Sequence, residues 1–516
     1  MAVTSGSCPN CGGQIEFRAG SSISLVCKYC KHVVVRTDRD FQNLGKIADV
    51  VFGDTALAPG DRGTFKGRSF SVEGRLVLQH PAGGQWEEYY VVFAGQPAWV
   101  SEAQGFWQVV WAAQAPAPPP HHLQPGMQVQ LGTHGTFVVA EKNEATFLAG
   151  EGELPFAAKP GTKRLFVDLS GPGGGFATID YGDGTGAPQI YVGSQTSFAE
   201  FQITERGGDR PAAAVKTDAI KCPSCGAPLP VLSAGTERAA CRHCNAISDV
   251  KLQQVVARQA QARQVPGIEL GRKGVMPLAD GRGIYNQEWT VLGYVERSTG
   301  AQGTDDWFGW QEYLLYNPQH GYRWLVYDEG QFYYITPLGA GDVDASRAPV
   351  FVVFRNLHFR RRNAQQCRVD YVLGEFYWKV QNGETVQMED YEHGREIVSV
   401  ERTASEVNWS HGVIVPVPVI VQAFGFQVKT SPYGAPPPAA FNAGYTPPAS
   451  SGGGSGVIIA LVIVLVVFVL MIAACGACSS GSRRSSGYSS SGYSSSSSSG
   501  GVRGVGGSSS GGFGGK

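Results

Sequence analysis

The sequence predicts a mainly β protein with two small zinc ribbons, two β-rich domains of the barrel or sandwich type, and one C-terminal transmembrane helix. Three observations predict this fold class. Eight of the 11 cysteines fall into two clusters of four. Aromatic-rich runs with an alternating apolar pattern follow each cluster. One long uncharged apolar segment lies near the C-terminus.

The composition limits the class of protein. A chain of 516 residues is long enough for two to four domains. Its 42 basic and 43 acidic side chains nearly cancel, so it lacks the broad positive field that attracts nucleic acid. Clustered cysteine pairs indicate metal ligands in a reducing compartment rather than a disulfide framework. The first residues have neither the basic start nor the apolar core of a secretory signal.

The first cysteine cluster has the spacing of a zinc ribbon. Cys8 and Cys11 are followed, after fifteen intervening residues, by Cys27 and Cys30. Each CxxC turn supplies two thiolates, and four thiolates complete a tetrahedral zinc site. Because no position stays open for water, we expect a structural rather than a catalytic ion.

The second cluster repeats this spacing. It consists of Cys222, Cys225, Cys241 and Cys244. We therefore predict two structural zinc ions in all. A redox role for CxxC would require a thioredoxin-like βαβ pattern, which is not visible. We interpret the nearby His32 and His243 as surface residues or hydrogen-bond donors, since four thiolates already fill each site.

The β-rich region is doubled as well. The motif that starts at Trp86 recurs at Trp310, and Trp99 recurs at Trp324. A weaker match relates Asp180 to Asp390. Aromatic residues at strand spacing usually belong to the core. We expect this of Trp86, Trp99, Trp107, Trp310 and Trp324.

A duplicated unit divides the chain into seven parts. We predict zinc ribbons at residues 1–36 and 213–250, and β-rich domains at residues 37–212 and 251–430. Each β-rich domain is expected to begin with a linker helix, at residues 37–50 and 251–264, where helix-favouring side chains are frequent. A Pro/Gly linker (431–456), a transmembrane helix (457–478) and a disordered Gly/Ser-rich tail (479–516) follow.

The segment from Val457 to Cys478 carries no charged residue. At about 1.5 Å per residue it measures roughly 33 Å, enough to cross a bilayer. A buried core helix is the alternative, but it would not normally lie between a Pro/Gly linker and a Gly/Ser tail. We therefore expect the lipid bilayer to be a partner of this segment.

The orientation of this span involves two opposing arguments. Arg483 and Arg484 follow the span, and the positive-inside rule would place them in the cytosol. Export of two metal-loaded domains without a signal argues for the reverse. We expect a single-pass protein of the bacterial inner membrane, with its N-terminal domains in the cytoplasm and its tail outside.

Several motifs resemble a known family. They are PGDRGTF at residues 59–65, WEEY at 86–89 and WVSE at 99–102, with WQEY at 310–313 in the second copy. Together they resemble the bacterial family called domain of unknown function 4178. The resemblance implies a β-rich bacterial domain that is often joined to ribbons or membrane segments. It implies no catalytic residues.

The function we expect is that of a non-catalytic binding or scaffold protein. Its two units would recruit protein partners at the cytoplasmic face of the membrane. The chain contains no Ser/His/Asp set, P-loop or dinucleotide-binding motif.

Two alternatives remain. One is an enzyme with a site between the β-rich domains that uses Glu88 and Glu312 as acids. We interpret these two residues, like Glu153 and Glu375, as hydrogen-bond acceptors at turns or strand edges. The other is nucleic-acid binding by the ribbons, which their few basic residues disfavour.

Overall fold

A computed structural model describes residues 5–37, 41–46, 56–103, 105–157, 159–207, 220–233, 235–260, 265–280, 283–301 and 303–426. The predicted Pro/Gly linker (431–456), the span from Val457 to Cys478 and the Gly/Ser tail (479–516) lie outside these residues. Among the described residues, no helix combines the length and apolar character that a membrane crossing requires. The α-helix there, α1 (Val417–Phe424), has 8 residues.

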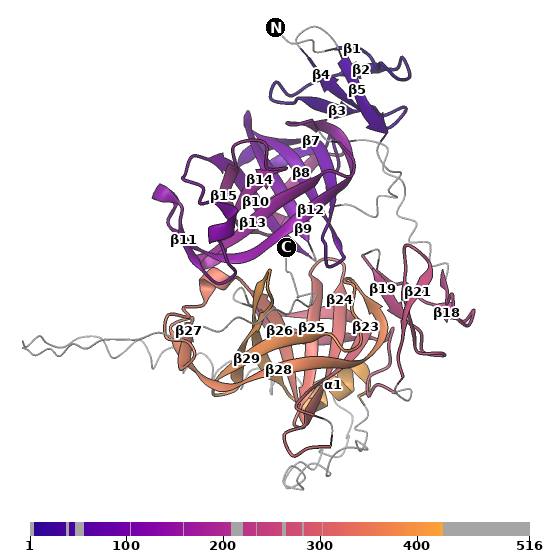
Figure 1. Ribbon diagram of the computed structural model, residues 1–516, viewed down its shortest axis with the longest axis vertical. Coiled ribbons are helices and arrows are strands. Elements are labelled where there is room, and N and C mark those ends of the chain that lie inside the picture. The colour runs from indigo at the N-terminus through magenta and orange to yellow at the C-terminus, as the bar shows by residue number, and fades with distance from the viewer. Residues whose placement is uncertain are drawn as a thin grey trace, which may run out of the picture. The chain divides into compact units, whose positions relative to one another are not determined.

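The described chain is built almost entirely of antiparallel β-strands, which confirms the predicted fold class (Figure 1). Its first barrel is a closed ring, because β7 pairs with both β8 and β12. Closure leaves no free sheet edge within the ring. In spatial order the ring contains β7 (Arg68–Gln79), β8 (Gln85–Phe93), β9 (Gln96–Ala103), β10 (Phe106–Ala113), β15 (Gln189–Thr196), β14 (Gly175–Gly182), β13 (Lys163–Gly171) and β12 (Thr136–Leu154).

The second barrel has the same order of pairing, and β23 and β28 close it. Its ring contains β23 (Gly283–Thr299), β24 (Phe308–Asn317), β25 (Gly321–Asp328), β26 (Gln331–Leu338), β31 (Val407–Val415), β30 (Glu396–Arg402), β29 (Thr385–His393) and β28 (Leu357–Phe376). The duplication seen in the cysteine spacing therefore extends to the topology of the barrels.

Each barrel follows a ribbon made of short strands. The first ribbon contains β1 (Ser5–Ser7), β2 (Gln14–Glu16), β3 (Ser24–Val26), β4 (His32–Arg36) and β5 (Phe41–Lys46). The second contains β17 (Ile220–Lys221), β18 (Pro228–Leu229), β19 (Arg238–Ala240), β20 (Ala246–Asp249) and β21 (Gln254–Arg258). Further strands flank the barrels, namely β6 (Arg62–Phe65), β11 (Gln128–Gln130), β16 (Phe201–Glu205), β22 (Lys273–Asp280) and β27 (Phe351–Phe354).

One long strand joins each ribbon to its barrel. β12 pairs with β13 and β7 in the barrel and then with β3 of the ribbon. β28 pairs in the same way with β29, β23 and β19. The three-stranded sheet of each ribbon is therefore a hydrogen-bonded continuation of the barrel sheet, whereas the hairpins β1–β2 and β17–β18 form separate two-stranded sheets.

The strands of the first barrel bury side chains on both faces. On β8, Trp86 and Tyr90 join an interior cluster, whereas Tyr89 and Phe93 join a second cluster that includes Phe65 of β6. This follows from the two-residue period of a strand. The five tryptophans expected in the cores are all buried, with at most 9% of their surface exposed.

The two predicted linker helices are wrong over the residues that the structure describes. Within residues 37–50, β5 is a strand that pairs with β4; within residues 251–264, β21 is a strand that pairs with β20. Val255 of β21 packs against the core of the second ribbon. Sheet pairing and burial therefore outweigh the helix propensity of these segments.

The weak match between Asp180 and Asp390 is also wrong. Asp390 lies on β29 opposite Asn363, and the equivalent strand of the first barrel, β13, places Asp168 opposite Glu141. Asp180 lies on β14, the strand that corresponds to β30. The structural equivalent of Asp390 is therefore Asp168. The short motif at Asp180 recurs at Asp390 on a strand that is not its structural equivalent.

Candidate functional site

The first cysteine cluster lies at the tips of two turns. Cys8 and Cys11 lie between β1 and β2, and Cys27 and Cys30 lie between β3 and β4. All four sulfur atoms lie within 4.8 Å of one another, with 3.7 Å from Cys8 to Cys30 and 3.8 Å from Cys11 to Cys27. In a tetrahedral site with metal–sulfur bonds of about 2.3 Å, the sulfur atoms lie about 3.8 Å apart. The cluster therefore fits such an ion.

The second cluster reproduces this geometry. The sulfur atoms of Cys222 and Cys244 are 3.7 Å apart, and those of Cys225 and Cys241 are 3.8 Å apart. Each cluster places all four predicted ligands together and leaves no coordination position for a substrate. The arrangement suits a structural metal rather than chemistry at the metal.

Backbone hydrogen bonds preform the turns that carry the thiolates. The amide of Gly12 donates to the carbonyl oxygen of Cys8, and that of Lys31 donates to the carbonyl oxygen of Cys27. In the second ribbon Gly226 and Asn245 donate in the same way to Cys222 and Cys241. All four donor residues have positive φ angles, between 56° and 74°. This tight turn orients the two sulfur atoms of a CxxC pair toward one point.

Glu153 and Glu375 fasten each ribbon to its barrel. Glu153 accepts hydrogen bonds from the amides of Arg18 (2.6 Å) and Ala19 (2.9 Å). Glu375 accepts from the amide of Leu232 (2.8 Å) and the hydroxyl of Thr236 (2.8 Å). Both glutamates are 4% exposed. Their interpretation as hydrogen-bond acceptors is confirmed.

Glu88 and Glu312 each accept a hydrogen bond from the indole of their own strand. Trp86 Nε1 donates to Glu88 at 2.9 Å, and Trp310 Nε1 donates to Glu312 at 2.7 Å. Burial raises the pKa of Glu312, whereas the guanidinium of Arg297, 3.4 Å away, lowers it. Glu312 lines a cavity of about 250 Å³, and Glu88 is not among its lining residues. The cavity therefore does not bring the two proposed acids together.

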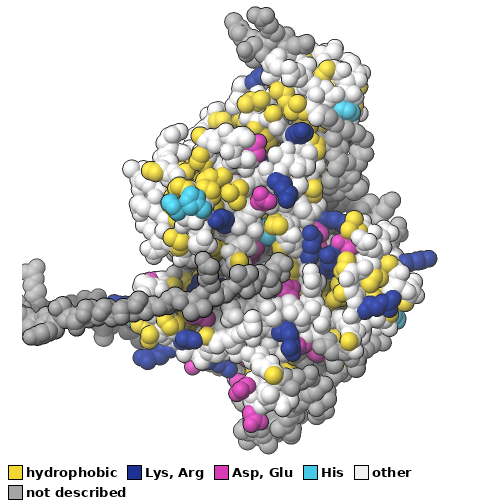
Figure 2. Space-filling model, viewed as in Figure 1, with side chains coloured by type: hydrophobic (Ala, Val, Ile, Leu, Met, Phe, Trp, Pro, Cys, Tyr) yellow, Lys and Arg dark blue, Asp and Glu magenta, His cyan; other side chains and the backbone are white. Residues whose placement is uncertain are grey.

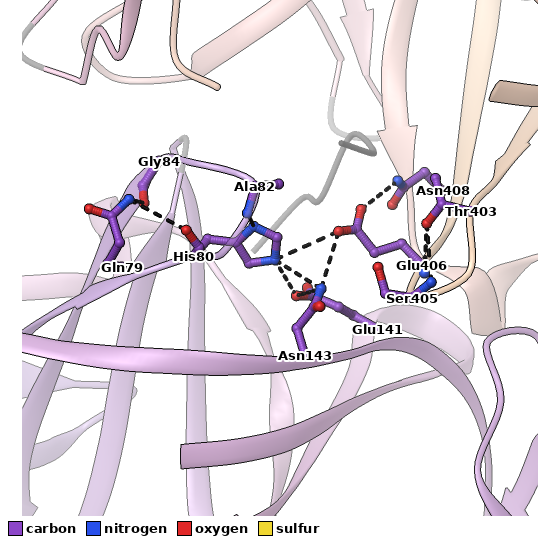
Figure 3. Close-up of polar contacts among 10 residues, drawn as sticks. All are labelled: Gln79, His80, Ala82, Gly84, Glu141, Asn143, Thr403, Ser405, Glu406 and Asn408. Atoms are coloured by element: carbon purple, nitrogen blue, oxygen red, sulfur yellow. Dashed lines mark hydrogen bonds and ion pairs between the residues drawn. The ribbon is translucent and has the colours of Figure 1, made fainter. Parts of the chain in front are cut away.

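A third polar cluster, His80, Glu141 and Glu406, joins the two repeats (Figure 3). His80 Nε2 lies 2.7 Å from Glu141 Oε1 and 3.6 Å from Glu406 Oε1. Asn143 Nδ2 donates to both carboxylates, at 3.0 Å and 3.3 Å. Burial and the charge of Glu141 raise the pKa of Glu406 to about 7.

The composition of this cluster would suit a metal, but its hydrogen bonds assign another role. The amide of Ala82 donates to His80 Nδ1 at 3.2 Å, so the ring proton belongs on Nε2, which faces Glu141. A protonated nitrogen cannot bind a metal. We therefore interpret the cluster as a hydrogen-bonded contact between the repeats. The nearby amide of Lys142 supports this by donating to the carbonyl oxygen of Ser405 at 2.9 Å.

The sequence interpretation missed both this contact and the charged residues inside the second barrel. The cavity is lined by Asp328, Asp390 and Glu401 in addition to Glu312. Their signal in the sequence is weak, because a single carboxylate within a strand such as β24 or β30 is equally typical of an exposed face. His80, Glu141 and Glu406 offered no such signal, since two loops and a strand from different repeats bring them together.

One face of the protein bears on the alternative of a nucleic-acid interface. On the face shown in Figure 2, basic and acidic side chains are interspersed rather than gathered by sign. A nucleic-acid footprint is normally a basic stripe or patch.

Two tandem ribbon–barrel units, each with a four-cysteine site, define a class of duplicated metal-site β protein. The family model described as "Domain of unknown function (DUF4178)" matches residues 58–198 and 284–416, and the chain belongs to this family. The resemblance noted from the sequence motifs is thereby confirmed for both copies. No curated protein and no solved structure matched the chain.

Proposed function

We propose that this chain is a membrane-anchored, non-catalytic binding protein of bacteria whose two ribbon–barrel units recruit protein partners at the cytoplasmic face. The main support for this proposal is the continuous sheet across each ribbon–barrel junction. β12 and β28 cross the junctions, and Glu153 and Glu375 hold the ribbons in place. A rigid unit presents a fixed surface, which lowers the entropic cost of binding a partner.

We further propose that both four-cysteine sites hold zinc. The sulfur spacings fit zinc–thiolate bonds, and thiolates favour zinc or iron over hard cations. Filled sites would stabilise the ribbons and leave the surrounding surface free for partners. A tightly packed four-thiolate site supplies no open position for catalysis.

The membrane part of the proposal rests on the uncharged segment from Val457 to Cys478. A single span would hold the ribbon–barrel units near the bilayer and raise the effective concentration of anything they bind there. The cytoplasmic placement of the units rests on the preference of thiolate–metal sites for a reducing compartment.

The test is a proximity-labelling survey with the full chain in its native host. A matched control carries only residues 431–516 behind the same label. We expect the full chain to fractionate with membranes and to enrich a reproducible set of proteins over the control. A soluble full chain, or an identical set of labelled proteins, would overturn the proposal.

The orientation is tested in the same cells. Protease added to spheroplasts should leave the ribbon–barrel units intact if they are cytoplasmic, whereas an epitope placed after residue 516 should be removed. Digestion of the units with protection of the epitope would reverse the orientation.

A further inference from the structure

A cavity of about 250 Å³ is lined mainly by strands of the second barrel and partly by residues of the first barrel. Its lining follows the two-residue period of the strands: Trp310 and Glu312 on β24, and Trp324, Val326 and Asp328 on β25. An eight-stranded barrel is just wide enough to hold either packed side chains or one small ligand. The cavity therefore extends into the interior of the second barrel, and first-barrel residues such as Phe106 and Phe176 complete its lining. Its volume is on the scale of a small molecule.

The walls of the cavity combine aromatic rings with carboxylates. Trp310, Trp324 and Trp409 line it together with tyrosines 333 and 377. Aromatic faces attract cations, and more strongly where water is excluded. Such walls would suit a ligand that is both partly apolar and positively charged.

Three buried oxygen atoms of the lining lack a hydrogen-bond partner among the described residues. They are Asp328 Oδ1, Asn363 Oδ1 and Glu401 Oε2. All three are acceptors, and a buried acceptor without a donor is unfavourable. A ligand that carries several N–H groups would satisfy them.

The charge of the cavity lining also favours a cationic ligand. Six acidic residues and one basic residue, Arg362, line the cavity. The acidic residues are Glu141, Asp168, Glu312, Asp328, Asp390 and Glu401. Arg297 binds Glu401 at 2.6 Å and Glu312 at 3.4 Å, and so offsets part of this charge. Burial, with the nearby charge of Glu329, raises the pKa of Asp328 to about 6. A cationic ligand would relieve the remaining carboxylate charge.

The first barrel has carboxylates at three of the equivalent positions, Glu88, Asp168 and Asp180, but it differs at two others. The strand registers place Leu78 opposite Trp86 where Arg297 lies opposite Trp310. Ala103 of β9 stands where β25 has Asp328, by the alignment of Trp99 with Trp324. Leu78 and Ala103 are both part of the packed apolar interior. The second barrel thus differs from its duplicate by one added arginine and one added carboxylate, Arg297 and Asp328.

We propose that this cavity binds a small organic cation with N–H donors, an alkylammonium or alkylguanidinium. The proposal deepens the proposed binding function and rests on its non-catalytic character. The ligand's nitrogen atoms would donate to Asp328, Asn363 and Glu401, and its carbon chain would lie against the indole rings.

The test is isothermal titration calorimetry of the full chain in a neutral detergent at pH 7.5. The probes are butylguanidinium, butylammonium and, as the uncharged analogue, butanol. We expect at least one cation to bind, and to bind about tenfold or more tightly than butanol. Failure of both cations to bind at millimolar concentration, or equal binding of butanol, would overturn the proposal.

Two variants locate the site. Asp328→Asn keeps the shape of the side chain and removes its charge, and we expect it to weaken cation binding about tenfold. The matched control is Glu88→Gln, which changes the first-barrel equivalent of Glu312 outside the cavity and should leave binding unchanged. Thermal unfolding of both variants verifies their folding. Unchanged binding by a folded Asp328→Asn variant would exclude the cavity.

The two proposals fail independently. If the chain labels the expected proteins but binds no cation, only the proposal of a ligand site is wrong. If the chain binds a cation but recruits no protein, the proposed scaffold function is wrong and the chain is a small-molecule binding protein.

Discussion

Gly152 pairs with Gly74 at the point where β12 leaves the first barrel for the ribbon. A Cβ atom on Gly74 would lie 1.9 Å from the carbonyl oxygen of Glu153, and the φ angle of Gly152 is +69°. The second repeat has the same pair, Gly374 with Gly293. The backbones approach so closely at this seam that only glycine fits. The closure of each barrel and the exit of its long strand depend on the same pair.

Gly74→Ala should destabilise the first repeat. The added methyl group would meet backbone atoms, which cannot move without opening the pairing of β7 with β12. We expect a loss of about 2 kcal/mol or more in the free energy of unfolding. Hydrogen exchange of the β7 and β12 amides, together with thermal unfolding, measures this.

The matched control is Gly186→Ala. Gly186 is exposed, and a Cβ atom there would meet nothing within 4 Å. This variant should unfold like the wild type. Equal stability of Gly74→Ala and Gly186→Ala would show that β7 and β12 can move apart enough to accept the methyl group.

The two ribbons should lose their metal independently. Cys27→Ser removes one of four ligands from the first site, and a three-thiolate site binds zinc more weakly. We expect the metal content of the purified full chain to fall from two ions to one. Elemental analysis by mass spectrometry measures this directly.

Cys367→Ser is the control for this loss. Cys367 is buried in β28, away from both clusters. The variant should retain two ions. A wild-type chain with fewer than two ions, or loss of metal from Cys367→Ser, would contradict the assignment of the ligands.

The metal ligands and the barrel cores could be predicted because their signals are local. Cys8 and Cys222 each begin a pair of CxxC turns, a spacing that is typical of four-thiolate metal sites. Trp86 and Trp310 lie in aromatic-rich runs that indicate buried strands. Closure of the barrels could not be predicted from local signals. It depends on pairing between strands far apart in the chain, and the glycines that permit it look like ordinary turn residues in the sequence.

The linker segments show where local propensity misleads. Residues of β5 and β21 favour helix by composition, yet the open edges of β4 and β20 supply hydrogen-bond partners for a strand. The carboxylates inside the second barrel could not be predicted for a related reason. A carboxylate such as Glu401 is typical of an exposed strand face, and only the closed ring places it inside.

Arg297→Met should destabilise the second barrel strongly. Arg297 is 5% exposed and binds both Glu312 and Glu401. Its removal would leave two neighbouring carboxylates without their cation, and such a loss costs about 3–5 kcal/mol. Adding Glu312→Gln and Glu401→Gln to this variant should recover part of the stability. Thermal unfolding of the full chain compares the three proteins.

An exposed ion pair provides the control. Lys273 and Glu288 are 3.1 Å apart with more than half of each side chain exposed. Lys273→Met should change the free energy of unfolding by less than about 1 kcal/mol. A similarly small effect of Arg297→Met would mean that water reaches the two carboxylates.

Glu406 should make the stability of the chain depend on pH. Its folded-state pKa of about 7 lies above the ordinary value of 4.5, because of burial and the charge of Glu141. Between these two values the folded chain holds a proton that the unfolded chain releases. The contribution of Glu406 to stability is therefore greatest below pH 4.5 and is lost as the pH rises through 7.

Glu406→Gln tests this directly. The amide resembles the protonated acid, and its oxygen still accepts from Asn143, while His80, Glu141 and Asn408 remain in place. The variant should lose stability less steeply than the wild type between pH 5 and pH 8, as measured by chemical denaturation. The control is Glu205→Gln, which changes an exposed carboxylate 3.9 Å from Arg62 and should keep the wild-type slope. Parallel pH profiles for Glu406→Gln and the wild type would mean that Glu406 keeps an ordinary pKa, and that the contact between the repeats does not respond to protons.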